Sequence, residues 1–226
     1  MHESIKILVD DIYKKLSSSG SETLELEVRL GQINDIQTDN RIYLPSKVPV
    51  VFYENKIYKF NPGVSELDFD FFNKKLFDYA KSKNKEEEID NFQDLQVITK
   101  QARIGIRDNK IVNAIRKVRL TNFDIYFPDF LYDIRVSISD EIPSKNVYEI
   151  DQILKDDGKM GIQKFKRERK RTSFTLDKYV FDLTKVKMSD YETNEVEMEL
   201  SNDVYGDKNK ISEFLDYAFN FLKRKV

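Results

Sequence analysis

Residues 24–30 read Leu-Glu-Leu-Glu-Val-Arg-Leu, so that every second side chain is apolar. Successive side chains of a strand point to opposite faces, and this stretch therefore predicts a β-strand with one apolar and one charged face. The charged face carries Glu25, Glu27 and Arg29. Residues 195–200 repeat the pattern as Glu-Val-Glu-Met-Glu-Leu, with Glu195, Glu197 and Glu199 on one face. The apolar face of each strand must be covered, and we expect helices to cover it.

The two acidic faces allow two interpretations. Same-face neighbours in a strand lie roughly 7 Å apart, and at an effective dielectric near 20 two carboxylates at that distance repel by about 2 kcal/mol. A face turned toward water would reduce this cost, and each strand alone fits that interpretation. If the sheet instead closes into a barrel with helices outside, the acids point inward, where a divalent cation would satisfy them.

A third strand supplies the opposite charge. Residues 167–173 place Arg167, Arg169 and Arg171 on one face, and a row of guanidinium groups suits the oxygens of a polyphosphate. The alternative is a solvated basic helix or a nuclear-localisation-like patch. Further cations stand on the middle strands: Arg103, Arg107, Arg116, Lys117, Arg119 and Arg135. A barrel with acids on one wall and cations on the others would hold a metal and a triphosphate.

The remaining chain predicts an antiparallel α+β domain spanning residues 1–226, with a barrel or curled sheet and helices outside. The spacing of apolar residues predicts helices at 4–16, 65–82 and 208–223. Ser65 and Asp68 resemble a capping box at the start of the second helix. Irregular structure is expected at 45–62 and in the polar stretch 81–90. Asp108-Asn109 predicts a turn, and Asp156-Asp157-Gly158 with Gly161 predicts a loop. Strands are expected at 95–99, 102–107, 111–120, 123–127, 131–139, 163–175 and 178–186.

Composition excludes several classes. The 226 residues carry 38 Lys and Arg against 40 Asp and Glu, so bulk charge does not hold a nucleic acid. There is no Cys, and the one His is His2. Any catalysis must therefore come from carboxylates, Lys, Arg, Tyr, Ser or Thr, and any metal must be a hard cation bound by oxygen. No apolar run is long enough to span a bilayer, and Glu3 and Asp10 argue against a signal peptide, so an intracellular protein is expected.

The quoted motifs resemble a known family. ELEVRLG at 25–31, RxRxRxSF at 167–174 and EVEMEL at 195–200, in this order, are similar to the signature strands of the metal-dependent RNA 5′-triphosphatases. These are the mRNA-capping β-subunits of fungi, protozoa and large DNA viruses, within the triphosphate tunnel metalloenzymes. The resemblance implies a closed eight-stranded antiparallel β-barrel with a polar interior. It implies hydrolysis of the γ-phosphate of 5′-triphosphate RNA, the first step of mRNA capping.

The resemblance also implies roles for single residues. Mg²⁺ or Mn²⁺ would bind Glu25, Glu27, Glu197 and Glu199, with Glu195 and Asp94 as further acids of the wall. The phosphates would contact basic residues of several strands, Glu141 would orient the attacking water and Asp182 would hold a basic side chain. The implied phosphate contacts are Arg103, Lys117, Arg135, Arg167, Arg169 and Arg171. Val180 stands where the family often has Arg, and Arg169 stands where Lys is common.

The implied partners are the triphosphate end of RNA and an RNA guanylyltransferase, in the same chain or another. A homodimer is compatible with the pattern, and no membrane is involved. The absence of Trp gives no support to the Trp-containing docking segment of the budding-yeast type. The protein would act in the nucleus if cellular, and in a cytoplasmic factory or virion if viral. Two alternatives stay open: a tripolyphosphatase or NTP phosphohydrolase of the same fold, and a non-enzymatic barrel that binds polyanions or RNA.

Overall fold

The computed structural model describes residues 3–53, 57–99, 102–144, 165–189 and 191–224. Its helices are α1 (Glu3–Ser19), α2 (Glu66–Ser82) and α4 (Lys208–Phe221), with short 3₁₀ turns η1 (Glu86–Glu88) and η2 (Asn202–Val204). Its strands are β1 (Leu24–Asp35), β2 (Val50–Phe52), β3 (Tyr58–Pro62), β4 (Ile89–Ile98), β5 (Arg103–Arg107), β6 (Lys110–Tyr126), β7 (Asp133–Pro143), β8 (Phe165–Leu176), β9 (Tyr179–Met188) and β10 (Tyr191–Leu200).

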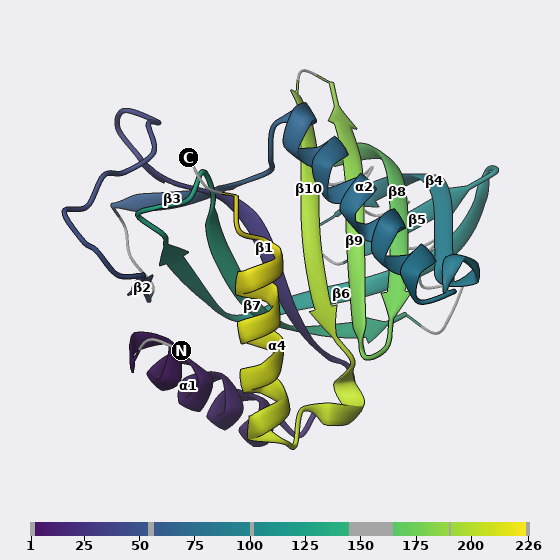
Figure 1. Ribbon diagram of the computed structural model, residues 1–226. Coiled ribbons are helices and arrows are strands. Elements are labelled where there is room, and N and C mark those ends of the chain that lie inside the picture. The colour runs from purple at the N-terminus through teal and green to yellow at the C-terminus, as the bar shows by residue number, and fades with distance from the viewer. Residues whose placement is uncertain (1–2, 54–56, 100–101, 145–164, 190, 225–226) are drawn as a thin grey trace.

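Eight of the described strands close into an antiparallel barrel (Figure 1). The strands follow the order β1, β10, β9, β8, β4, β5, β6 and β7, and β7 pairs again with β1. The first and last signature strands therefore lie side by side, with Glu27 opposite Glu199 and Arg29 opposite Glu197. The predicted closed barrel with external helices is confirmed.

Alternation along the strands separates an apolar outside from a polar inside. On β1, Leu26 and Val28 are fully buried in the main hydrophobic core, which also contains the apolar faces of α1, α2 and α4. Figure 1 shows α2 lying across β8, β9 and β10, and α4 beside α1. Because the helices cover the apolar faces, the charged faces of these strands must point into the barrel.

The helix α2 begins where its sequence predicts. The Ser65 hydroxyl accepts a hydrogen bond from the Asp68 backbone N–H at 3.1 Å, and it donates to the Asp68 carboxylate at 2.8 Å. Phe72, Leu76 and Ala80 form the buried stripe of this helix. The predicted helix start is therefore confirmed with Ser65 as its N-cap, although the Ser65 backbone N–H donates to the Tyr132 hydroxyl at 2.9 Å and not to the Asp68 carboxylate.

The barrel seam is closed by a side chain outside the strands. At the point where the β1–β10 ladder ends, the Leu26 backbone N–H donates to the Tyr205 hydroxyl at 2.7 Å. The same hydroxyl donates to the Leu200 carbonyl at 3.0 Å. Tyr205 thus continues the pairing of β1 with β10 by one further bridge.

The structure differs from the sequence expectation in three regions. The strand expected at 95–99 is β4, which already begins at Ile89, at the end of the stretch expected to be irregular. Strands predicted at 111–120 and 123–127 form one strand, β6, with a bulge between Arg119 and Thr121 that shifts its register. A bulge breaks the alternation without ending the strand, which explains the apparent gap. The stretch expected to be irregular contains β2 and β3, and β3 pairs with β1 beyond the barrel.

Asp108 and Asn109 do form the predicted turn, because both have φ in the left-handed region, at 51° and 59°. The predicted loop at 156–161 lies outside the described residues. Within the described part of the chain, no helix has both the length and the hydropathy to cross a bilayer.

Candidate active site

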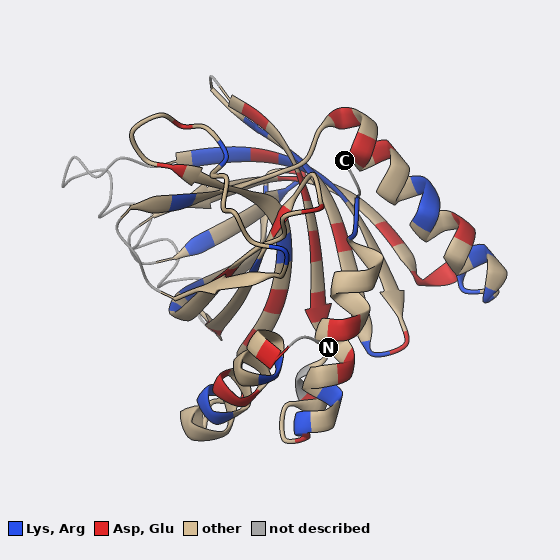
Figure 2. Cartoon of the chain, turned by 60° about the vertical axis from the view of Figure 1, so that its left-hand side comes forward, with Lys and Arg blue, Asp and Glu red and all other residues tan. Residues whose placement is uncertain are grey.

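The barrel interior holds a cavity of about 240 Å³ lined mainly by charged side chains. Acidic and basic bands both run along the strands of the barrel wall (Figure 2). The acids of this lining include Glu27 and Glu197, which are only 2% and 3% exposed. Charges buried to this degree are costly unless they are paired or bind an ion, so this cavity is the candidate site.

A larger hollow of about 440 Å³ lies on the outer surface beside α2. Its ion pairs, Lys185 with Glu66 at 3.1 Å and Lys187 with Glu192 at 3.3 Å, join exposed side chains. Exposed pairs contribute little free energy and do not demand a ligand. The chemistry therefore belongs to the interior.

Three carboxylates converge on a single point at one end of the acidic wall. Oxygens of Glu25, Glu27 and Glu199 lie within 4.8 Å of one another. Burial, followed by the repulsion of Glu27, raises the pKa of Glu25 to about 7. Burial and the acids Glu25, Asp182 and Glu197 raise the pKa of Glu199 well above its usual value. These two carboxyl groups therefore lack enough positive charge nearby.

The same three residues fit a hard cation. Among the described residues, Glu199 has no hydrogen bond or ion pair to its carboxylate. Glu27 Oε1 is buried without a hydrogen-bond donor, and a guanidinium nitrogen of Arg119 lies 3.9 Å from it. Convergent carboxylate oxygens, some of them without donors, form the ligand set that Mg²⁺ or Mn²⁺ takes. A second group, Asp182, Glu197 and Glu199, has similarly close oxygens.

Lys117 links the acids of β1 to the acid of β7. Its ammonium group contacts the carboxylate of Glu25, and it lies 3.5 Å from Glu27 and 2.9 Å from Glu141. Burial alone would lower the pKa of Lys117, but Glu27, Glu25 and Glu141 together raise it. Burial would likewise raise the pKa of Glu27, whereas Arg29, Lys117 and Arg119 lower it to about 2. Lys117 is thus a permanent cation between three carboxylates.

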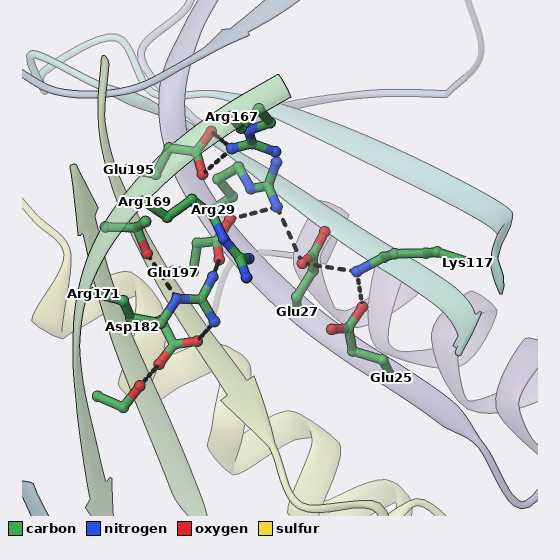
Figure 3. A network of polar contacts seen from close by, with 12 residues as sticks. Glu25, Glu27, Arg29, Lys117, Arg167, Arg169, Arg171, Asp182, Glu195 and Glu197 are labelled. Atoms are coloured by element: carbon green, nitrogen blue, oxygen red, sulfur yellow. Dashed lines mark hydrogen bonds and ion pairs between the residues drawn. The ribbon is translucent and has the colours of Figure 1, made fainter. Parts of the chain in front are cut away.

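The basic face of β8 points into the barrel, and each of its guanidinium groups is held by an acid (Figure 3). Arg167 donates to both oxygens of Glu195 at 2.9 and 3.0 Å, and Arg169 donates to both oxygens of Asp94 at 2.9 and 2.6 Å. The segment is a strand whose three arginines line the barrel interior, so the alternative of a solvated basic helix is wrong.

Arg171 is held from the neighbouring strand β9. Its guanidinium donates to Asp182 and, at 2.9 Å, to the Thr184 hydroxyl. The Ser173 hydroxyl donates to the other oxygen of Asp182 at 2.5 Å. These contacts fix the direction of the guanidinium group before any ligand enters.

Most of the predicted site residues line the one cavity. They come from all eight strands of the barrel: Glu25, Glu27, Asp94, Arg103, Lys117, Glu141, Arg167, Arg169, Arg171, Asp182, Glu195, Glu197 and Glu199. Arg135 is not among the lining residues. Its guanidinium donates to both oxygens of Asp124 at 2.6 and 2.8 Å and lies over the Phe60 ring.

Two lining residues were expected among the charges of the barrel without a specific role, and a third was not singled out. Arg29 pairs with Glu27 at 3.3 Å and with Glu197. Arg107 was expected among the cations of the middle strands, and it lines the cavity. Phe92 was not singled out, because its strand carries no comparable motif and only the pairing of β4 with β5 and β8 brings it to the site.

The comparisons with known proteins agree with this geometry. The family model described as mRNA capping enzyme, beta chain, matches residues 1–214. The mRNA-capping enzyme subunit beta of Schizosaccharomyces pombe is 24% identical over 224 residues, covering 88% of this chain and 69% of the relative. That of Candida albicans is 28% identical over 195 residues, covering 77% of this chain and 36% of the relative.

Solved structures show the same fold. The Schizosaccharomyces pombe Pct1 RNA triphosphatase, in complex with the Spt5 CTD, superposes with a TM-score of 0.81 at 19% identity, covering 100% of this chain and 95% of that chain. The Mimivirus capping enzyme triphosphatase superposes with a TM-score of 0.57 at 15% identity, covering 99% of both chains.

Proposed function

The chain belongs to the family of the mRNA capping enzyme beta chain, an RNA triphosphatase family, and we propose that its tunnel hydrolyses the γ-phosphate of 5′-triphosphate RNA. The products are 5′-diphosphate RNA and inorganic phosphate. The observation that carries this proposal is the cavity itself. A row of three arginines and a group of buried acids share one enclosed space, which suits a polyphosphate and a cation together.

The acids Glu25, Glu27 and Glu199 hold the cation, with Glu197 beside them. Their convergent oxygens and the unpartnered Glu27 Oε1 support this assignment. When bound there, Mg²⁺ or Mn²⁺ supplies Lewis-acid neutralisation of the charge on the phosphate oxygens.

The cationic residues bind the phosphates and stabilise the charge that develops during transfer. Arg167 and Arg169 keep their contacts with Glu195 and Asp94 and donate from their remaining N–H groups to phosphate oxygens. Because the acids already hold these guanidinium groups in place, little reorganisation is needed when the substrate binds. Arg103 has no ion pair within the described residues and adds a further cation from β5. Asp182 keeps Arg171 pointing into the cavity.

Glu141 positions the attacking water. It lies near the end of β7, is 29% exposed at its side chain, and forms an ion pair with Lys117 at 2.9 Å. A carboxylate that is reachable from solvent and fixed by a neighbouring cation can accept a hydrogen bond from water and direct its lone pair along the line of displacement.

We place the protein in the capping pathway as one domain over residues 1–226. Its partner is an RNA guanylyltransferase, in the same chain or a separate one, because the curated relatives are named as capping enzyme subunits. The compartment is the one in which capping occurs, the nucleus of a cell or the cytoplasmic factory of a virus.

Release of γ-phosphate tests the proposal directly. RNA labelled at its γ-phosphate is incubated with the protein in Mg²⁺, Mn²⁺ or chelator, beside inorganic tripolyphosphate and free NTP. We expect metal-dependent release from RNA, abolished by Glu25→Ala and unchanged by Glu192→Ala. Glu192 is the matched control, because it lies on β10 but on the outer surface. Hydrolysis of tripolyphosphate or NTP without release of phosphate from RNA would instead support the alternative of a tripolyphosphatase or NTP phosphohydrolase. No phosphate release from RNA, tripolyphosphate or NTP would support a non-enzymatic barrel that binds polyanions.

A further inference from the structure

The interior cavity opens beside the β5–β6 hairpin. Within the described chain, the cavity-lining residues that are exposed are Val112, 48% exposed, and Asn113, and both lie at the start of β6. The residues that precede them, 108–110, are exposed as well. We therefore take the exit past this hairpin as the path of an RNA whose triphosphate end is held among the buried charges.

An aromatic ring lies on this side of the cavity. Phe92 on β4 is half-buried and stands opposite Arg171 in the β4–β8 register, one inward-facing position from Asp94. It is the one aromatic side chain among the described lining residues of a cavity that is otherwise mostly charged. A phosphate site gains nothing from an apolar ring, whereas every nucleobase has a face that stacks on one.

The Arg107 side chain lies over the face of this ring. Its guanidinium carbon lies 4.6 Å from the Phe92 ring centroid, and that of Arg171 lies 6.0 Å away. Arg171 is paired with acids, but Arg107 makes no ion pair with any described residue, and its Nε is buried without an acceptor. A guanidinium plane stacked on an aromatic ring and left without an acid can serve a base or a phosphodiester.

We propose that Phe92 and Arg107 form a stacking platform for the first nucleoside of the substrate at the mouth of the tunnel. The inference rests on the proposed function and defines its substrate class. The platform lets the enzyme distinguish a nucleotide-borne triphosphate from inorganic tripolyphosphate, because the phosphate contacts alone are common to both. Phe92 contributes sequence-tolerant stacking, and Arg107 contributes a second plane and a cation for the backbone beyond it.

Steady-state kinetics of Phe92→Leu on two substrates tests the platform. Loss of a base–aromatic stack worth ~1–3 kcal/mol should raise KM for 5′-triphosphate RNA by about tenfold or more, with little change in kcat. The kinetic constants for tripolyphosphate should not change. Phe92→Tyr should restore the RNA KM, and Arg107→Lys, which keeps the charge but removes the plane, should raise it partly.

Phe71→Leu is the matched control. Phe71 on α2 also carries an arginine over its ring, with Arg224 at 4.3 Å, but it lies on the outside of the barrel. This variant should behave as wild type on both substrates.

A binding measurement supports the kinetics without requiring turnover. An RNA with a 5′-triphosphate and 2-aminopurine as its first base is mixed with excess protein in chelator. Stacking should quench its fluorescence with wild-type protein and with Phe92→Tyr, but not with Phe92→Leu. Three results would overturn the platform. Phe92→Leu could raise KM equally for RNA and tripolyphosphate, it could leave KM for RNA unchanged, or the fluorescence quench could persist in this variant. These outcomes are distinct from failure of the proposed function, in which the wild-type protein releases no γ-phosphate from RNA.

Discussion

Glu25 and Glu27 stand on the same face of the same strand, yet the barrel shifts their pKa values in opposite directions. Glu27 is surrounded by Arg29, Lys117 and Arg119, so its pKa falls to about 2 although burial opposes this. Glu25 has Lys117 but also faces Glu27 and Glu141, and burial raises its pKa to about 7. The tunnel thus keeps one carboxylate ionised and leaves its neighbour in need of a cation.

The Glu199 carboxylate should be needed for activity and yet lower the stability of the metal-free folded protein. It is repelled by the surrounding acids and has no compensating partner among the described residues. We expect Glu199→Gln to abolish phosphate release while leaving the melting temperature in chelator unchanged or higher. Added Mn²⁺ should raise the melting temperature of the wild type and not of the variant. Turnover near normal, or equal stabilisation of both proteins by Mn²⁺, would remove Glu199 from the ligand set.

Glu141 should behave differently from the ligands. Glu141→Gln keeps the size of the side chain and removes its charge, so turnover should fall at least a hundredfold if it positions the water. The Mn²⁺ concentration at half-maximal activity should change little, because the proposed ligands lie on β1 and β10. Recovery of activity at high Mn²⁺ would instead make Glu141 a ligand, and a lower melting temperature with normal turnover would make it structural.

At the scale of the element, β8 shows how one strand separates two environments. Arg169 and Arg171 face the tunnel, and Lys170 between them faces the outer hollow. We expect Arg169→Ala and Arg171→Ala each to lower kcat by a hundredfold or more, on the order of 3 kcal/mol of transition-state stabilisation. Lys170→Ala on the same strand should have no effect. Far-UV circular dichroism checks that each variant folds. Arginine variants that fold and keep most activity would contradict the phosphate-binding role of β8.

The start of α2 should give the fold a pH dependence. Burial would raise the pKa of Asp68, but hydrogen bonds from Tyr132, Arg224 and Ser65 hold it below its usual value. A lowered pKa means that this carboxylate stabilises the folded state fully above its unfolded pKa, near 4, and that the contribution is lost as pH falls through the folded value.

Asp68→Asn should therefore lower the free energy of unfolding at pH 6 by ~1.5–3 kcal/mol, the usual worth of hydrogen bonds to a charged group. The difference from wild type should shrink as the pH approaches 3, as measured by urea unfolding across this range. Asp70→Asn, an exposed change on the same helix, is the control. A difference that stays constant with pH would show that the charge of Asp68 contributes nothing.

At the scale of the whole molecule, the sequence predicted which segments form the barrel strands better than it predicted which side chains meet inside the barrel. Alternation in 24–30 and 195–200 and the N-cap at Ser65 depend on neighbours in sequence, and each was correct. Arg135 fits the alternation of β7, yet it pairs with Asp124 because of the register between β6 and β7. Phe92 reaches the cavity through strand pairings that no local pattern encodes. Which inward residues meet is thus decided by register, and a bulge such as that in β6 changes it.

Closure of the barrel depends on the seam between β1 and β10, and Tyr205 offers a way to weaken it without touching the tunnel. Its hydroxyl bridges the Leu26 N–H and the Leu200 carbonyl, all in the buried core. Tyr205→Phe keeps the ring packed but leaves a buried donor and acceptor unpaired, which should lower the free energy of unfolding by ~1–3 kcal/mol. For a chain of this size each kcal/mol corresponds to about 2–4 °C in melting temperature. Tyr43→Phe, in which the altered ring is 86% exposed, should be neutral in the same measurement. Because Glu27 faces Glu199 across this seam, a looser seam should also weaken the stabilisation by Mn²⁺. A Tyr205→Phe protein with wild-type stability would mean that the strand ladder alone closes the barrel.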